Sequence, residues 1–122
     1  MAPAGLQAAL GPRSFFEDFP LGRGWIAAEG GAYDEHLVCD VGLLFLALIV
    51  VTAWAALRGE LVVPVGVAWL ILGVGHFAYH VGHLDGLGGV DRIGLVVSLV
   101  AIPTLAAAVL AAAKWPARAV PE

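Results

Sequence analysis

Three long apolar stretches constrain the fold of this chain more than any other feature of its sequence. They cover residues 37–57, 61–83 and 93–113 approximately, and a transmembrane helix needs about 20 mostly apolar residues. Hydrophobic residues make up 61% of the 122 residues and charged residues only 13%, whereas soluble domains contain about 25% charged residues. The sequence therefore predicts an all-α fold, a polytopic transmembrane helix bundle that forms one membrane domain over residues 1–122.

The connections between these stretches indicate how the three spans are arranged. The segment Arg58-Gly59-Glu60 is long enough only for a tight turn, so the first two spans are expected to be antiparallel neighbours. The second connection, from His83 to Arg92, is rich in glycine and is expected to be a loop. Residues 1–35 mix aromatic and charged side chains, which suits the headgroup region of a bilayer. We expect an interfacial segment there, beginning with a short apolar helical piece.

Charge indicates the orientation and the class of partner. Basic residues near span ends favour the cytoplasmic side, and Arg58, Lys114 and Arg118 lie on one side with few acidic residues nearby. We therefore expect a multi-pass protein of the cell (inner or plasma) membrane with a cytoplasmic C-terminus. The chain has no run of basic residues that would attract nucleic acid. Three spans bury little of their own surface, so contact with lipids and assembly, as a homo-oligomer or in a membrane complex, are expected.

All four histidines are predicted at one membrane face, where the start of the first span meets the end of the second. His76, His80 and His83 fall within an arc of about 60° on a helix. His36 and Asp40 have the i, i+4 spacing that would let the carboxylate accept from the imidazole.

Imidazole and carboxylate side chains in this pattern are typical of sites for copper, zinc or iron, and a histidine can also be an axial ligand of haem. One hypothesis is therefore a metal or haem site, near the extracytoplasmic face, whose candidate ligands are His76, His80, His83 and His36. Carboxylates behind the imidazoles would orient them, and the candidates for that role are Asp40, Glu35 and Asp85.

Two other interpretations remain open. The histidines could belong to a polar network or a helix-packing contact, since His36 and His83 are expected at the interface, where a histidine needs no ligand. His76 lies about a turn deeper, and ionisable residues at that depth are usually functional or paired. The chain would then be an accessory or structural subunit of a larger membrane complex, with no cofactor. Whether it is an enzyme does not follow from these residues.

An ordered set of short motifs resembles a family of small four-helix membrane proteins, mostly actinobacterial, that is loosely similar to the DoxX-like proteins. The resemblance covers roughly residues 11–110 and implies a bundle of four spans, with a first helix before residue 12. This chain departs from that pattern, because only Met1 to Leu10 remain where the family has its first helix. A DoxX-like protein would suggest a component of a quinone-linked redox enzyme. The motifs are Pro12-Arg13-Ser14-Phe15-Phe16-Glu17-Asp18-Phe19-Pro20, Glu35-His36-Leu37-Val38, Asp40-Val41-Gly42, His76-Phe77, His80 and His83-Leu84-Asp85-Gly86.

Overall fold

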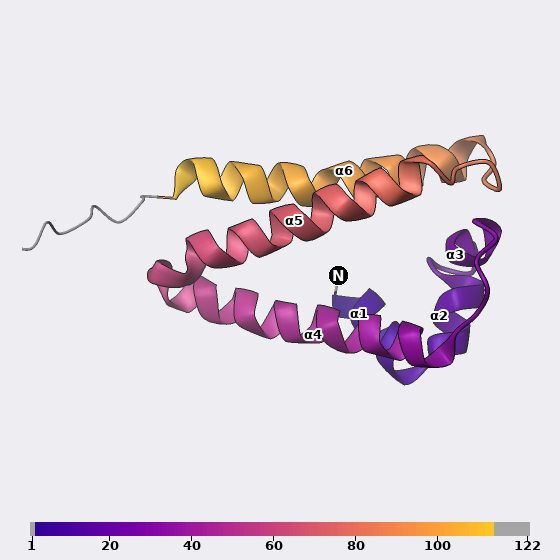
Figure 1. Ribbon diagram of the computed structural model, residues 1–122, viewed down its shortest axis with the longest axis horizontal. Helices are drawn as coiled ribbons and strands as arrows, with labels where there is room; N and C mark the ends of the chain where they lie inside the picture. The colour runs from indigo at the N-terminus through magenta and orange to yellow at the C-terminus, as the bar shows by residue number, and fades with distance from the viewer. Residues whose placement is uncertain (1, 114–122) are drawn as a thin grey trace, which may run out of the picture.

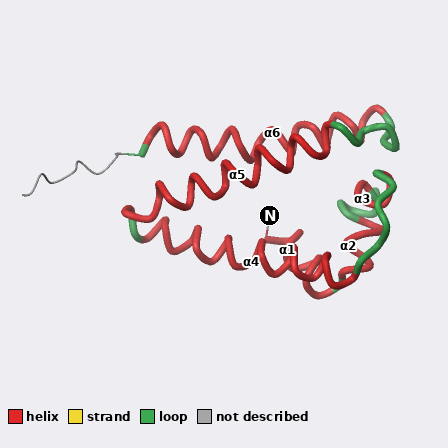
Figure 2. Tube along the Cα trace, viewed as in Figure 1, coloured by secondary structure: helices red, strands yellow, loops and turns green. Residues whose placement is uncertain are grey.

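The computed structural model describes residues 2–113, and this part of the chain is built of helices without any strand (Figures 1 and 2). Three short helices come first and three long ones follow, which confirms the predicted all-α fold. The elements are α1 (Ala2–Leu10), α2 (Pro12–Asp18), α3 (Trp25–Ala28), α4 (Glu35–Leu57), the 3₁₀ turn η1 (Gly59–Leu61), α5 (Val62–Val81) and α6 (Gly89–Ala112).

The three long helices are long and apolar enough to cross a membrane. The candidate spans are Glu35–Leu57, Gly59–Val81 and Gly89–Ala112, close to the predicted ranges. The largest difference is at α6, which begins inside the glycine-rich stretch expected to be a loop. Asp91 lies in the first turn of α6, where a negative charge complements the helix dipole.

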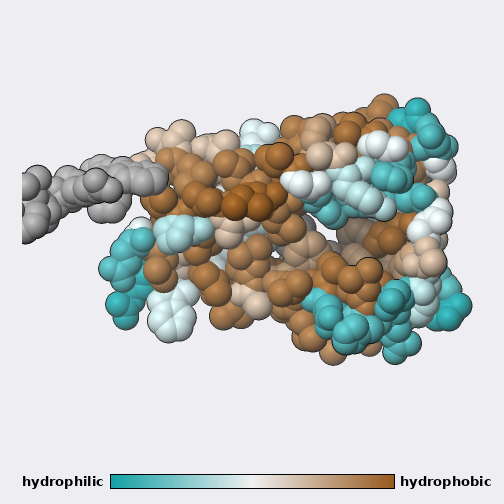
Figure 3. All heavy atoms as spheres, viewed as in Figure 1, coloured by the Kyte–Doolittle hydropathy of each residue, from teal (hydrophilic) through white to brown (hydrophobic). Residues whose placement is uncertain are grey.

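Few side chains are buried within residues 2–113, and most apolar side chains on the long helices face outward. Figure 3 shows apolar side chains over the middle of the visible face and hydrophilic ones towards the two ends. An apolar surface of this extent is suited to contact with lipid or with other protein. The chain therefore fits a small membrane protein. The buried apolar residues are Ala8, Phe15, Phe45, Ala55, Val65, Leu87, Leu95, Leu99 and Ala106.

The helices pack as two pairs. Helices α5 and α6 run alongside each other over most of their length, and the short α1 packs against α4 (Figure 1). The backbones of α1 and α4 lie close together at Gly42. A Cβ atom built on this glycine would lie 2.8 Å from the carbonyl carbon of Ala8 and nearer still to the nitrogen of Ala9. Only glycine fits this crossing without displacing α1.

Helices α4 and α5 meet at their tight turn and then diverge (Figure 1). Near the turn a hydrogen bond joins them: Trp69 Nε1 donates to Thr52 Oγ1 at 2.7 Å, and Thr52 Oγ1 donates to the carbonyl of Leu48 at 2.7 Å. Away from the turn, the opposite end of the molecule holds the start of α4, the end of α5 and the start of α6. We call it the histidine end, because the four histidines lie towards it.

Replacing Trp69 by phenylalanine is expected to weaken the α4–α5 pair slightly. The ring would keep most of its packing but lose the indole N–H, and hydrogen bonds between membrane helices contribute about 0.6 kcal/mol on average. We therefore expect the free energy of unfolding in detergent to fall by roughly 0.5–1 kcal/mol. Thr52→Val should produce a similar loss, and combining it with Trp69→Phe should add little further. Fully additive losses would contradict this assignment.

The N-terminal segment forms short helices, where the sequence predicted an interfacial segment with a helical start. Helix α2 begins at Pro12, a residue suited to the first turn of a helix, and packs against α1, α3 and α4. The basic residues Lys114 and Arg118, used above to predict the orientation, lie outside the described residues.

Candidate functional site

His76 and His80 form a pair on one face of α5 near its end. Their ring centroids lie 4.3 Å apart, and the ring planes meet edge to face at 76°. The i, i+4 spacing places both side chains on the same face of the helix, one above the other. Both residues are partly buried. The structure thus brings these two of the predicted ligands together.

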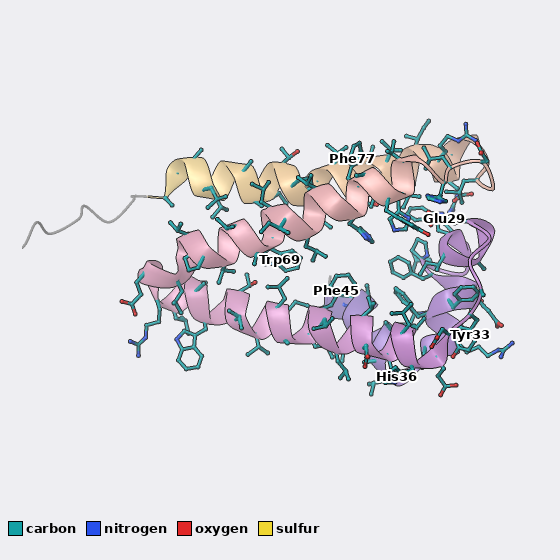
Figure 4. All side chains as sticks on the ribbon, in the orientation of Figure 1. Glu29, Tyr33, His36, Phe45, Trp69 and Phe77 are labelled. Atoms are coloured by element: carbon teal, nitrogen blue, oxygen red, sulfur yellow. The ribbon has the colours of Figure 1, made fainter. Side chains whose placement is uncertain are left out.

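The polar partner of His80 is Glu29, the residue that directly follows α3. Its Oε1 lies 2.6 Å from Nδ1 of His80, and the two side chains are only 9% and 14% exposed. Figure 4 shows Glu29 beside the end of α5. With Glu29 ionised, its carboxylate can only accept a hydrogen bond, and Nδ1 of His80 is then the donor. In the neutral ring, Nε2 is then the atom that accepts.

His83 turns away from this pair. Helix α5 ends at Val81, two residues before His83. His83 therefore does not lie on the helix face that carries His76 and His80. Its ring stacks on Tyr79 with centroids 4.4 Å apart, and its Nδ1 donates to the carbonyl of Tyr79 at 2.8 Å. His83 and Asp85 are both exposed. In the described chain, no hydrogen bond or ion pair joins Asp85 to a histidine.

His36 lies at the same end of the molecule but not at the same site. Its Nε2 is 3.2 Å from Oδ2 of Asp40, and the two side chains are 89% and 53% exposed. Figure 4 shows His36 on the side of α4 away from α5. Because α4 and α5 diverge, the tight turn does not bring the start of one helix beside the end of the other. The adjacent Glu35 is exposed as well, in the first turn of α4.

The four histidines therefore share one end of the molecule without sharing a centre. Within residues 2–113, no group of three or more His, Cys, Asp or Glu side chains is arranged to hold a metal ion. The predicted metal or haem site stays a prediction, and its two adjacent members are His76 and His80.

A second polar contact joins the N-terminal segment to α6. Asp91 Oδ1 accepts from Trp25 Nε1 at 2.8 Å and from Nε of Arg23. Beneath it, Trp25 and Ala28 pack against a small apolar cluster at the start of α6. That cluster consists of Leu87, Leu95 and Leu99, with Phe77 and Leu84 at its edge.

Glu29 and Asp91 were missing from the predicted site. Glu29 is 51 positions from His80, and no motif contains either residue. The only signal for Glu29 was a single acidic residue directly after the apolar run Trp25-Ile26-Ala27-Ala28.

Comparison with known proteins identifies no relative of this chain. No protein-family model, no curated protein and no solved structure matches the chain. The geometry of the site is therefore the basis for inferring its function.

Proposed function

We propose that this chain is a plasma-membrane protein that holds and passes a proton at its extracytoplasmic end, through Glu29, His80 and His76. The observation that carries this proposal is the 2.6 Å contact between Glu29 and His80, made by two nearly buried side chains. His80 belongs to the candidate span Gly59–Val81, and ionisable residues within a membrane span are costly and are generally both paired and functional. A purely structural pair at this position could be apolar at lower cost.

The geometry supports acid–base chemistry in three steps. Glu29 holds the Nδ1 proton of His80, which leaves Nε2 free to take up a second proton. The carboxylate then stabilises the imidazolium that forms, as carboxylates do behind catalytic histidines. His76, whose ring packs edge-on against that of His80, is the nearest imidazole, and the proton would reach it through a bridging water. Together the three side chains form a short path from the end of α5 to one turn further into the membrane.

This site is proposed to serve a larger membrane assembly. The apolar faces of α4, α5 and α6 are largely exposed in the single chain, and lipid or partner helices would cover them. A homo-oligomer or an accessory subunit fits this surface. The DoxX-like resemblance favours a redox complex linked to quinone, in which proton transfer is required. The proposed orientation, with the α4–α5 turn and the C-terminus in the cytoplasm, rests on the basic residues near the span ends.

The test is a pH titration of the protein in lipid nanodiscs, with the imidazole nitrogens observed by ¹⁵N NMR. We expect Nδ1 of His80 to carry a proton that is hydrogen-bonded to Glu29, and Nε2 to take up a second proton as the pH is lowered. Glu29→Gln should change the ¹⁵N signals of His80 and His76 while leaving those of His36 and His83 as they were. If His80 stays in one protonation state at every pH at which the protein remains folded, the proposal is wrong.

A transition-metal site is the second candidate, and one observation favours it. A carboxylate behind a metal-bound imidazole is the usual supporting contact, and Glu29 stands in that position behind His80. His76 and His80 supply two imidazoles, whereas zinc sites use three or four protein ligands. A zinc ion held by this pair would therefore need a further ligand from a second chain, whereas a haem would need only an axial histidine.

Metal analysis and an absorption spectrum of protein purified without chelators would decide this second candidate. A near-stoichiometric metal or a haem absorption band that disappears in the His76→Ala/His80→Ala variant is the expected result. A chain with neither metal nor chromophore, in the oligomeric state in which it is extracted, would exclude it.

A further inference from the structure

Residues 23–29, which include α3, lie across the histidine end. On one side they continue from α2, which packs against α1 and α4. On the other side they contact α5 through Glu29 and α6 through Arg23 and Trp25. Since α4 diverges from α5 towards this end (Figure 1), these seven residues connect the α1–α4 pair to the α5–α6 pair.

Asp91 anchors one end of this segment. A single carboxylate oxygen accepts from both the indole of Trp25 and the guanidinium of Arg23. A hydrogen bond to a charged group is stronger than one between neutral groups. The contact is independent of His80, because Asp91 belongs to α6 and Glu29 lies at the opposite end of α3.

The segment also fits closely onto the α5–α6 loop. A Cβ atom built on Gly86 would overlap the carbonyl oxygen of Ala28, so the backbones meet there directly. The ring of Trp25 lies close to Gly94 of α6, 3.2 Å from a Cβ atom built on that glycine. With its first residue bound to Asp91 and its last bound to His80, the segment covers the Nδ1 side of His80, whose ring in turn packs edge-on against that of His76.

Glycines border the segment on both sides. Gly22 precedes it, and Gly30 and Gly31 follow it; a Cβ atom built on any of these three would meet nothing within 4 Å. At the first border, backbone hydrogen bonds from Gly22 N to the Asp18 carbonyl and from Trp25 N to the Phe19 carbonyl tie the segment to α2. At the second border, Gly30 and Gly31 are uncrowded and Gly30 has a positive φ of 82°, so this glycine pair is the place where the segment can turn.

We propose that residues 23–29 are a lid that controls access to His80 and His76, and that Asp91 is the latch that keeps it closed. Glu29 is then both part of the proton path and the tip of the lid, so opening the lid removes the carboxylate from His80. The lid itself follows from the contacts above; its role in gating proton transfer rests on the proposed function.

Histidine acylation by diethyl pyrocarbonate, quantified at each position by mass spectrometry, tests the lid. His36 and His83 are exposed and serve as internal references in every sample. In the unchanged protein, His80 and His76 should react more slowly than these two. Asp91→Ala should raise the rates at His80 and His76 by about tenfold, the factor expected from losing a charge-assisted hydrogen bond, and leave His36 and His83 unchanged. Asp85→Ala, an exposed acidic residue in the neighbouring loop, is the matched control and should have no effect.

Trp25→Phe provides a milder second variant, because it deletes only the indole N–H. A selective rise at His80 and His76 in this variant supports the latch even if Asp91→Ala unfolds the protein and exposes every histidine. Unchanged His80 reactivity in Trp25→Phe, or in a folded Asp91→Ala protein, overturns the proposal. The acylation rates do not depend on proton transfer. If Asp91→Ala raises the rate at His80 but the NMR experiment shows no proton uptake there, the lid stands and the proposed function is refuted.

Discussion

Replacing Gly42 by leucine is expected to separate α1 from α4 and to be among the most destabilising single changes in the chain. The new Cβ atom would lie 2.8 Å from the Ala8 carbonyl carbon and 2.9 Å from the Ala8 Cβ atom. These neighbours belong to the α1 backbone or are attached directly to it, so no side-chain rotation relieves the overlap. Overpacking of this kind costs about 1–3 kcal/mol, and occasionally more.

Equilibrium unfolding in detergent would measure this loss, and hydrogen exchange would locate it. Amides of α1 should exchange faster in Gly42→Leu, whereas those of α5 and α6 should be unaffected. Gly75→Leu is the matched control, because a Cβ atom on Gly75 of α5 would meet nothing within 4 Å, and it should change stability by less than about 0.5 kcal/mol. Equal effects at the two glycines would show that α1 does not pack as described.

The contact between Glu29 and His80 is expected to give the largest coupling energy of any polar pair in the described chain. Truncating either partner leaves the other nearly buried without its hydrogen bond, at a cost of about 1–3 kcal/mol. In a double-mutant cycle of Glu29→Ala and His80→Ala, we expect a coupling of about that size, because removing the second partner adds little.

The chain offers its own control for this cycle. His36 and Asp40 form the same kind of acid–imidazole pair at 3.2 Å, but the two side chains are 89% and 53% exposed. Exposed ion pairs contribute about 0.2–1 kcal/mol, so the cycle with His36→Ala and Asp40→Ala should fall in that lower range. Comparable couplings in the two cycles would mean that Glu29 and His80 are as well solvated as the exposed pair, which would remove the basis of the proposed site.

Much of the fold could be predicted from sequence, because a membrane-spanning helix requires about 20 consecutive, mostly apolar residues, and such a stretch is visible in the sequence itself. The α4 helix, for example, is apolar for nearly all of its 23 residues, and the short Arg58–Glu60 connection allows only a hairpin. The α5–α6 loop was less predictable. Its glycines indicated a loop up to Arg92, but α6 begins at Gly89, and the Arg92 guanidinium donates to the carbonyl of Leu84 at 3.1 Å.

The candidate site was only half predictable. The i, i+4 pair of His76 and His80 follows from helical geometry alone. The angle between α4 and α5 does not, because crossing angles depend on how side chains interlock along both helices. That angle separates His36 from His80, and the N-terminal segment brings Glu29 to His80 instead. A contact across 51 positions leaves no periodic pattern in the sequence.

The contacts of residues 23–29 also set an order of events during synthesis. Trp25 and Glu29 emerge from the ribosome long before Asp91 and His80, which belong to the last two helices, and domains are made from the N-terminus onward. The early segment cannot dock until the α5–α6 hairpin has been translated and inserted. A nascent chain that stops after α4 would carry an unpaired glutamate and an unpaired tryptophan at the membrane surface. Docking of this segment thus comes after insertion of all three long helices.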